Sequence, residues 1–97
     1  MKTLTEIKNL LFLQKKALKK DFNIKEISIF GSYAKGEQRS RSDLDLLVDF
    51  NKPVSLLKIV SLENYLKDVL KQKVDVVPKN NLRIELKNKI LEEAIRI

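Results

Sequence analysis

The sequence predicts an α+β fold: a small mixed β-sheet of about three strands, packed by helices, in the order α-β-α-β-α-β-α. Apolar residues recur at helical spacing in three long stretches, which predict the main helices. Three short runs rich in β-branched residues predict the strands. A chain of 97 residues suffices for one domain with a thin core, so we expect a single domain over residues 1–97.

The first part of the chain is expected to form a long helix, a strand and a short helix. Apolar side chains at helical spacing predict the long helix over residues 3–20, with Thr3 in a capping box. The β-branched run 26–30 predicts the first strand. Gly31 then lets the backbone turn closely, and residues 32–35 are expected to open a short helix.

The second part is expected to form a strand, a long helix, a strand and a closing helix, over residues 43–50, 55–71, 73–77 and 82–96. A strand, a helix and a strand in succession form a βαβ unit, whose two strands should be parallel. Only a short connection joins the first strand to the second, so we expect this pair to be antiparallel. The sheet should therefore be mixed.

The apolar stripes of the later helices are expected to face the core. They include Leu56, Leu57 and Val60 in the second long helix and Leu86 and Leu91 in the last helix. An apolar helix face on so small a domain could also serve a homo-oligomer or a hetero-oligomer, and the sequence leaves this open.

The chain is basic, with 20 Lys and Arg residues against 13 Asp and Glu residues and a net charge of +7. A basic balance is typical of proteins that bind nucleic acid, anionic lipid or phosphate ligands, but also of a Lys-rich solvated surface. Aromatic residues are few and are not interleaved with the basic ones, which disfavours stacking on single strands. We do not expect nucleic acid to be the main partner.

The sequence has no cysteine and no histidine. This excludes disulfides, Cys-based zinc sites, thiol nucleophiles and histidine general bases, so any chemistry must use carboxylates, hydroxyls, Lys or Arg. No apolar run reaches membrane-spanning length, and no signal peptide is visible. We therefore expect no membrane association and a cytoplasmic location.

Three acids are the candidate catalytic and metal-binding residues. Asp43 and Asp45 alternate with leucines at the start of the second strand, so both should lie on one face of the sheet. Two adjacent carboxylates repel each other unless a cation lies between them, and Mg²⁺ prefers such oxygen ligands. Taken alone, an exposed Asp-x-Asp pair could simply be solvated. A third acid, Asp75, lies in the apolar strand KVDVV, where an unpaired buried carboxylate would be costly, and parallel pairing could place it beside the first two.

Candidate phosphate-binding residues lie before these acids. Gly31 and Ser32 stand at a strand end, where backbone donors are available, and Ser42 precedes the second strand. The loop between them is basic, with Lys35, Arg39 and Arg41, although exposed loop charges without a ligand are an equal alternative. A P-loop is excluded, because Glu and Gln follow the second glycine where Lys and Ser or Thr are required.

Such a site would support two-metal nucleotidyl transfer. One Mg²⁺ held by Asp43 and Asp45 would neutralise the triphosphate, and a second, bridged to Asp75, would lower the pKa of the acceptor hydroxyl. Asp75 could also take the acceptor's proton. Gly31 and Ser32, with help from Ser42, would hold the terminal phosphates.

Gly31-Ser32, a spacer and Asp43-Leu44-Asp45-Leu46 together resemble the signature of the polymerase-beta-type nucleotidyltransferase superfamily. The small size is similar to that of its minimal nucleotidyltransferase (MNT) branch, whose single domain is about as long as this chain. The resemblance implies the nucleotidyltransferase fold and an active site formed by the glycine, the serine and three strand acids, the third being Asp75. Lys35 stands where the family often has Arg, which could weaken a bidentate phosphate contact.

The resemblance also implies a reaction and a partner. Members of the branch are antitoxins of small all-helical HEPN toxins encoded nearby. They transfer AMP from ATP to a tyrosine of the toxin and also bind it. We therefore expect ATP as co-substrate, Mg²⁺ as cofactor and a HEPN toxin as partner.

Other functions stay open at this point. A non-catalytic module could neutralise the partner by complex formation alone, and a nucleotidyltransferase could act on a different acceptor. A protein that binds nucleic acid would lose affinity steeply with added salt, whereas the enzyme should show nucleotide binding that depends on Mg²⁺.

Overall fold

The computed structural model describes residues 2–39 and 42–97. In these ranges it has five α-helices, one turn of 3₁₀-helix and a four-stranded sheet. In chain order the elements are α1 Leu4–Leu13, α2 Lys15–Phe22, β1 Ile24–Phe30, α3 Ser32–Lys35, β2 Leu44–Phe50, α4 Leu56–Leu70, β3 Val74–Pro78, η1 Lys79–Asn81, α5 Ile84–Glu93 and β4 Ile95–Arg96. The predicted α+β class is confirmed.

The sheet has the strand order β3-β2-β1-β4. As predicted, β1 and β2 are antiparallel, and β2 and β3, joined by α4, are parallel. The parallel pairing sets Asp45 directly beside Asp75, and the antiparallel pairing sets Asp45 opposite Phe30. The three residues therefore form a row across one face of the sheet, because directly paired residues point to the same side.

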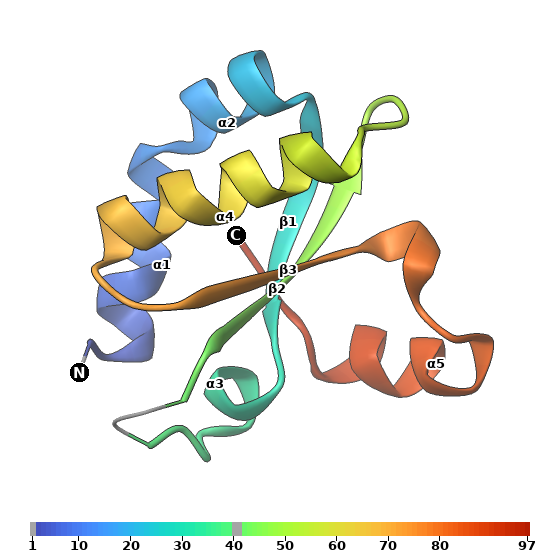
Figure 1. The fold of residues 1–97 in the computed structure, drawn as a ribbon. Coiled ribbons are helices and arrows are strands. Elements are labelled where there is room, and N and C mark those ends of the chain that lie inside the picture. Colours follow the sequence, from blue (N-terminus) through green and yellow to red (C-terminus); the bar gives the residue numbers. More distant parts are fainter. Residues whose placement is uncertain (1, 40–41) are drawn as a thin grey trace.

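The two faces of the sheet are covered differently (Figure 1). Helices α1, α2 and α4 pack on one face, where Leu44, Leu46 and Ile29 join the buried core. On the other face α5 lies over only part of the sheet, with Leu91 near Leu47. The row with Asp45 belongs to this second, more open face, so the fold leaves its carboxylates accessible.

The helix expected over residues 3–20 is two helices in the structure. The capping box at Thr3 is present, but α1 ends at Leu13 and α2 begins at Lys15. At Gln14 the backbone N–H is shared between the carbonyls of Leu10 and Leu11, a tightening typical of a helix end. The Gln14 side chain also accepts a hydrogen bond from the hydroxyl of Tyr65 in α4. The prediction of one helix was wrong because the apolar spacing continues across the break.

The helix expected to run to residue 96 ends at Glu93, and the last residues form β4. This adds a fourth strand to the three that were expected. Ile95 pairs with Ile29, and the Ile97 N–H donates to the carbonyl of Ile27 over 3.0 Å. Without β4, the outer edge of β1 would present unpaired backbone N–H and C=O groups. The β-branched isoleucines of β4 suit a strand at this edge.

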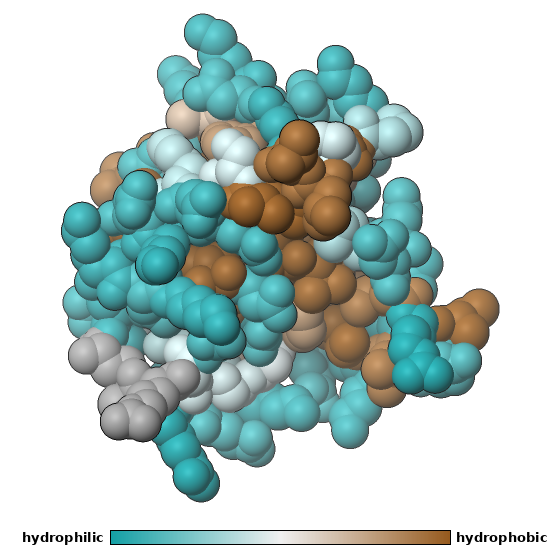
Figure 2. All heavy atoms as spheres, in the orientation of Figure 1, coloured by the Kyte–Doolittle hydropathy of each residue, from teal (hydrophilic) through white to brown (hydrophobic). Residues whose placement is uncertain are grey.

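The helices bury narrower faces than expected. Helix α4 buries Leu62, Leu66 and Leu70 but leaves Leu56 and Leu57 75% and 82% exposed. In α5 no residue is fully buried, and Leu86 and Leu91 are 47% and 40% exposed. Apolar side chains therefore reach the surface from the start of α4 toward α5 (Figure 2).

In the described part of the chain, none of the helices combines the length and the apolar character that a membrane crossing requires.

Candidate active site

The three predicted acids lie together at one end of the parallel strand pair. Asp45 of β2 is the register partner of Asp75 of β3, and such neighbouring strands are about 4.8 Å apart. Asp43 directly precedes β2 and lies on the same side of the strand as Asp45, two residues away. Asp75 is exposed, so the expectation that it would be a buried acid was wrong. The expected grouping of the three carboxylates on one face is nevertheless observed.

The surroundings of Asp45 disfavour its ionised form. Its pKa is raised above the ordinary value of 3.8, first by burial and then by the negative charges of Asp75 and Asp43. Lys73 offsets part of the charge, because its Nζ is 3.7 Å from Asp43 Oδ2. That pair is largely exposed, so it contributes little to stability. Among the described residues, the one ion pair made by the three carboxylates is that of Asp43 with Lys73.

This charge predicts a stability gain when Asp45 is neutralised. A raised folded-state pKa means that stability is highest below 3.8 and is lost as pH rises through the folded-state value. At neutral pH the ionised Asp45 thus destabilises the protein without metal. We expect Asp45→Asn to raise Tm by a few degrees at pH 7 in EDTA and to leave it unchanged at pH 3. Differential scanning calorimetry of both proteins checks this, and an equal or lower Tm at pH 7 would contradict it.

Gly31 lies against the Asp45 carboxylate. Its backbone has φ +72° and ψ −146°, a conformation that residues other than glycine rarely adopt. A Cβ atom at this position would overlap Asp45 Oδ2 and lie 3.2 Å from Asp45 Cγ. Glycine is therefore required both by the turn and by the close approach, and the predicted grouping of Gly31 with the acids is observed.

The one-turn helix α3 follows Gly31 and begins at Ser32. Tyr33 fixes it: the ring is only 1% exposed, and its hydroxyl accepts a 2.8 Å hydrogen bond from the Gln72 side chain. Gln72 lies two residues before β3, the strand of Asp75. The backbone at Gly31 and Ser32 is thus tied to the strand that carries the third acid.

The predicted loop residues lie in different surroundings. The Ser42 hydroxyl accepts a 2.8 Å hydrogen bond from the Arg39 N–H, and the Ser42 N–H donates to the Arg39 carbonyl over 2.9 Å. Ser42 therefore closes the loop before the acids. Lys35 reaches the other way and pairs with Glu93 of α5 at 3.5 Å. Arg41, the remaining predicted basic residue, lies outside the described residues.

The acidic side chains at this end of the sheet are candidate ligands for a metal ion. Across residues 2–39 and 42–97, no three His, Cys, Asp or Glu side chains stand in the arrangement of a ready-made metal site. The chemistry of the donors nevertheless fits a hard cation. Asp45 and Asp75 are adjacent carboxylates with Asp43 nearby, and their mutual repulsion is of the kind that a bound Mg²⁺ relieves.

Sequence reasoning missed Lys73 and Glu93. Lys73 could have been found, because extending the parallel register back by one residue from Leu44 and Val74 sets Lys73 beside Asp43. Glu93 had no such signal, since its position near Lys35 depends on how α5 packs against the open face of the sheet.

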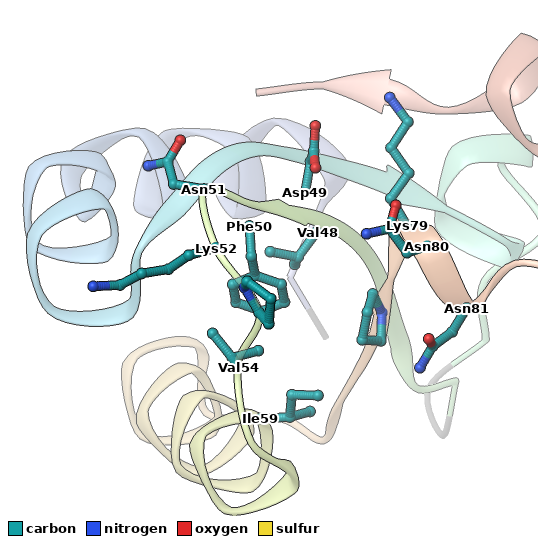
Figure 3. Close-up of a pocket in the computed structure, with 12 residues that line it drawn as sticks. Val48, Asp49, Phe50, Asn51, Lys52, Val54, Ile59, Lys79, Asn80 and Asn81 are labelled. Carbon is teal, nitrogen blue, oxygen red and sulfur yellow. The ribbon is translucent and has the colours of Figure 1, made fainter.

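A hollow of about 390 Å³ lies at the end of β2 opposite to the three acids (Figure 3). Val54 and Ile59 face it, whereas the side chains of Lys52 and Lys79 extend away from its centre. Its β2 residues begin at Val48, about 10 Å along the strand from Asp45. None of the three acids lines it, so this hollow is separate from the cluster of carboxylates.

Known sequences are similar to this chain over most or all of its length. A family model described as the nucleotidyltransferase domain matches residues 13–97. A Methanocaldococcus jannaschii protein that carries the provisional name protein adenylyltransferase is 50% identical over 95 residues, which cover 98% of this chain and 97% of the relative. Protein adenylyltransferase MntA of Thermococcus cleftensis is 42% identical, and the match covers 100% of this chain and 98% of the relative.

Solved structures share the fold. One that is provisionally described as a minimal nucleotidyltransferase is 32% identical, with a TM-score of 0.77 over 99% of this chain and 97% of the other. A chain in the complex of a tri-AMPylated Shewanella oneidensis HEPN toxin with an MNT antitoxin has a TM-score of 0.63 over 90% of this chain and 70% of the other. Its identity is 20%, so this likeness shows the fold alone.

Proposed function

Because this chain belongs to the nucleotidyltransferase domain family, we propose that it is a protein adenylyltransferase that acts as an antitoxin. It transfers AMP from ATP to a hydroxyl, a tyrosine in our proposal, of a HEPN toxin in the cytoplasm and so neutralises the toxin. The whole chain, residues 1–97, serves as one catalytic domain. The observation that carries the proposal is the pairing of Asp45 with Asp75, with the Gly31 backbone against the Asp45 carboxylate.

The relatives support each part of this proposal. Proteins that match nearly the whole chain are named protein adenylyltransferases. Among structures with this fold, one is a toxin–antitoxin complex with AMP-PNP, an ATP analogue, and another contains an AMPylated HEPN toxin. ATP, AMP transfer and a HEPN partner are thus each represented among relatives or structures of the same fold.

In this proposal the carboxylates of Asp43, Asp45 and Asp75 hold Mg²⁺. When bound, Mg²⁺ neutralises the phosphates and makes the acceptor oxygen more nucleophilic. The backbone N–H groups at Gly31 and Ser32 hold the terminal phosphates. The Ser42 hydroxyl accepts a hydrogen bond from the Arg39 N–H and so closes the preceding loop. Because Ser42 directly precedes Asp43, it can help to hold the terminal phosphates.

The reaction is one displacement at the α-phosphorus. The acceptor hydroxyl oxygen forms a bond to this phosphorus, and the bond from the α-phosphorus to the oxygen that bridges to the β-phosphorus breaks. Pyrophosphate leaves with that bridging oxygen. The hydroxyl proton passes to the exposed Asp75 carboxylate and from there to water.

The position of a radioactive label in ATP tests the proposal. The chain is incubated with its HEPN toxin, Mg²⁺ and ATP labelled at either the α- or the γ-phosphate. AMP transfer places the α-label on the toxin and releases the γ-label as pyrophosphate. Toxin labelled only from the γ-phosphate would indicate phosphoryl transfer instead, and toxin labelled from neither would contradict the proposed reaction.

A second candidate function, neutralisation by binding alone, is favoured by one observation. Leu56 and Leu57 leave an apolar surface at the start of α4 that suits a protein partner (Figure 2). The two functions are compatible, since an enzyme that modifies a protein must also bind it. A variant with Asp43 and Asp45 both replaced by asparagine separates the two functions. If it still neutralises the toxin, binding alone is sufficient.

A further inference from the structure

The strand that carries Asp75 lies at the edge of the sheet. In the described ranges the strand order is β3-β2-β1-β4, so β3 pairs with β2 alone. β3 has five residues, and Asp75 is the second of them. A short edge strand presents backbone groups without ladder partners, and its ends open more easily than those of a central strand. The position of the Asp75 carboxylate therefore depends on what holds the outer side of β3.

Glu63 of α4 bonds to this outer side. Its Oε2 accepts a hydrogen bond of 2.8 Å from the Val76 N–H. This length is within the range of charge-assisted hydrogen bonds, which are stronger than those between neutral groups. Pro78, two residues further along β3, has no N–H to donate. Glu63 thus supplies an acceptor that a neighbouring strand would otherwise provide.

The bonded N–H belongs to the peptide group that follows Asp75. This group joins the Asp75 carbonyl to the Val76 nitrogen, and it moves as one unit because it is planar. Holding its N–H therefore also fixes the backbone dihedral ψ of Asp75. On the other side of β3, the register pairs Asp75 with Asp45 and Val76 with Leu46. The backbone at Asp75 is held from both sides, by β2 and by Glu63.

The packing of α4 in turn fixes Glu63. Leu62, directly before it, and Leu66, one turn later, are both fully buried. α4 packs against β3, and the hydrogen bond between Glu63 and Val76 is partly buried. A hydrogen bond in such surroundings is stronger than one in water. The bond therefore connects a rigidly packed helix to the strand that carries the third acid.

We propose that Glu63 is a positioning residue, whose bond to the Val76 N–H keeps Asp75 in register with Asp45 so that their carboxylates share one divalent cation. The role of this cation in catalysis rests on the proposed function. Glu63 acts through the backbone of β3 and takes no part in the displacement. Groups that hold metal ligands in place change metal affinity about ten- to a hundredfold when they are removed.

Glu63→Met and Glu63→Gln form the matched pair that tests this role. Both new side chains are uncharged and close to glutamate in length, but only glutamine keeps an oxygen that can accept the Val76 N–H. Asp68→Met is the control for the substitution itself, because Asp68 is an exposed acid on the same helix. EPR titration with Mn²⁺ alone measures the Kd of each folded protein, since Mn²⁺ suits the same carboxylate ligands as Mg²⁺. Amide hydrogen exchange measures the protection of the Val76 N–H.

We expect Glu63→Met to weaken Mn²⁺ binding about tenfold and to lose the protection of the Val76 N–H. Glu63→Gln and Asp68→Met should keep the Kd within about twofold of the wild type and retain the protection. In the label-transfer assay, raising the Mg²⁺ concentration should restore the rate of Glu63→Met. A mere loss of folded protein would not show this recovery. If Glu63→Met does not fold, Glu63→Ala takes its place with the same expected loss.

Equal losses of Mn²⁺ affinity in Glu63→Met and Glu63→Gln would overturn the proposal, because the charge of Glu63 rather than its hydrogen bond would then hold the cation. An unchanged Kd in Glu63→Met, or a weaker Kd with the Val76 protection intact, would also overturn it. The same holds for a loss as large in Asp68→Met, and for a wild type that binds no Mn²⁺.

The titration is independent of the proposed function, because it uses neither ATP nor the toxin. Weaker Mn²⁺ binding in Glu63→Met, together with a wild type that transfers no AMP, would keep the role of Glu63 and remove the adenylyltransferase. AMP transfer by the wild type, together with an unchanged Mn²⁺ Kd in Glu63→Met, would do the reverse.

Discussion

Replacing Asp43 and Asp45 together by asparagine should reduce AMP transfer at least about a thousandfold, because charges placed at the reacting centre contribute on this scale. Both carboxylates lie at the start of β2, and Asn keeps their size while removing two charges. The variant should fold at least as well as the wild type, since ionised Asp45 is disfavoured where it lies. The rate of label transfer from α-labelled ATP to the toxin measures the effect.

Asp49→Asn is the matched control for this prediction. Asp49 lies on the same strand and the same face as Asp45 but near the opposite end of β2, where it lines the hollow of about 390 Å³. Removing its charge should leave the transfer rate within about twofold, as for a surface change away from the reacting groups. If the control loses as much activity as the double variant, the acids have no special role.

Gly31→Ala should reduce both stability and activity. The new Cβ would overlap Asp45 Oδ2, and alanine is strained at φ +72° and ψ −146°. We expect a loss of about 1–3 kcal/mol in the free energy of unfolding from backbone strain. Displacing the Asp45 carboxylate should also lower the transfer rate about a hundredfold, because misplacement by about 1 Å has an effect of this size. Urea unfolding and the label-transfer assay measure the two losses.

The second glycine in the chain separates strain from displacement. Gly36 has φ +70°, and a Cβ atom there would meet no atom within 4 Å. Gly36→Ala should therefore lower stability by about 1–2 kcal/mol through strain alone and keep the transfer rate of the wild type. Equal activity losses in the two glycine variants would show that Gly31 acts only through stability.

The grouping of the site residues could be predicted from the sequence because local rules determine it. The βαβ connection requires β2 and β3 to be parallel, and strand alternation then puts Asp45 and Asp75 on one face. The same register would have identified Lys73 as the partner of Asp43.

Features that depend on distant packing could not be predicted. The apolar spacing continues through Gln14, whose hydrogen bond with Tyr65 comes from a helix far along the chain. The isoleucines at the C-terminus fit a helix as well as a strand, and only the free edge of β1 decides for β4. The contact of Lys35 with Glu93 likewise depends on where α5 lies against the sheet.

The intact mass of the HEPN toxin, measured with its activity, tests the central claim most directly. The toxin is incubated with this chain, ATP and Mg²⁺, and the double variant of Asp43 and Asp45 is run in parallel. We expect neutralised toxin whose mass has increased by one or more AMP units with the wild type, and toxin of unchanged mass with the variant. Toxin neutralised by the wild type at unchanged mass would contradict AMP transfer and leave binding as the mechanism.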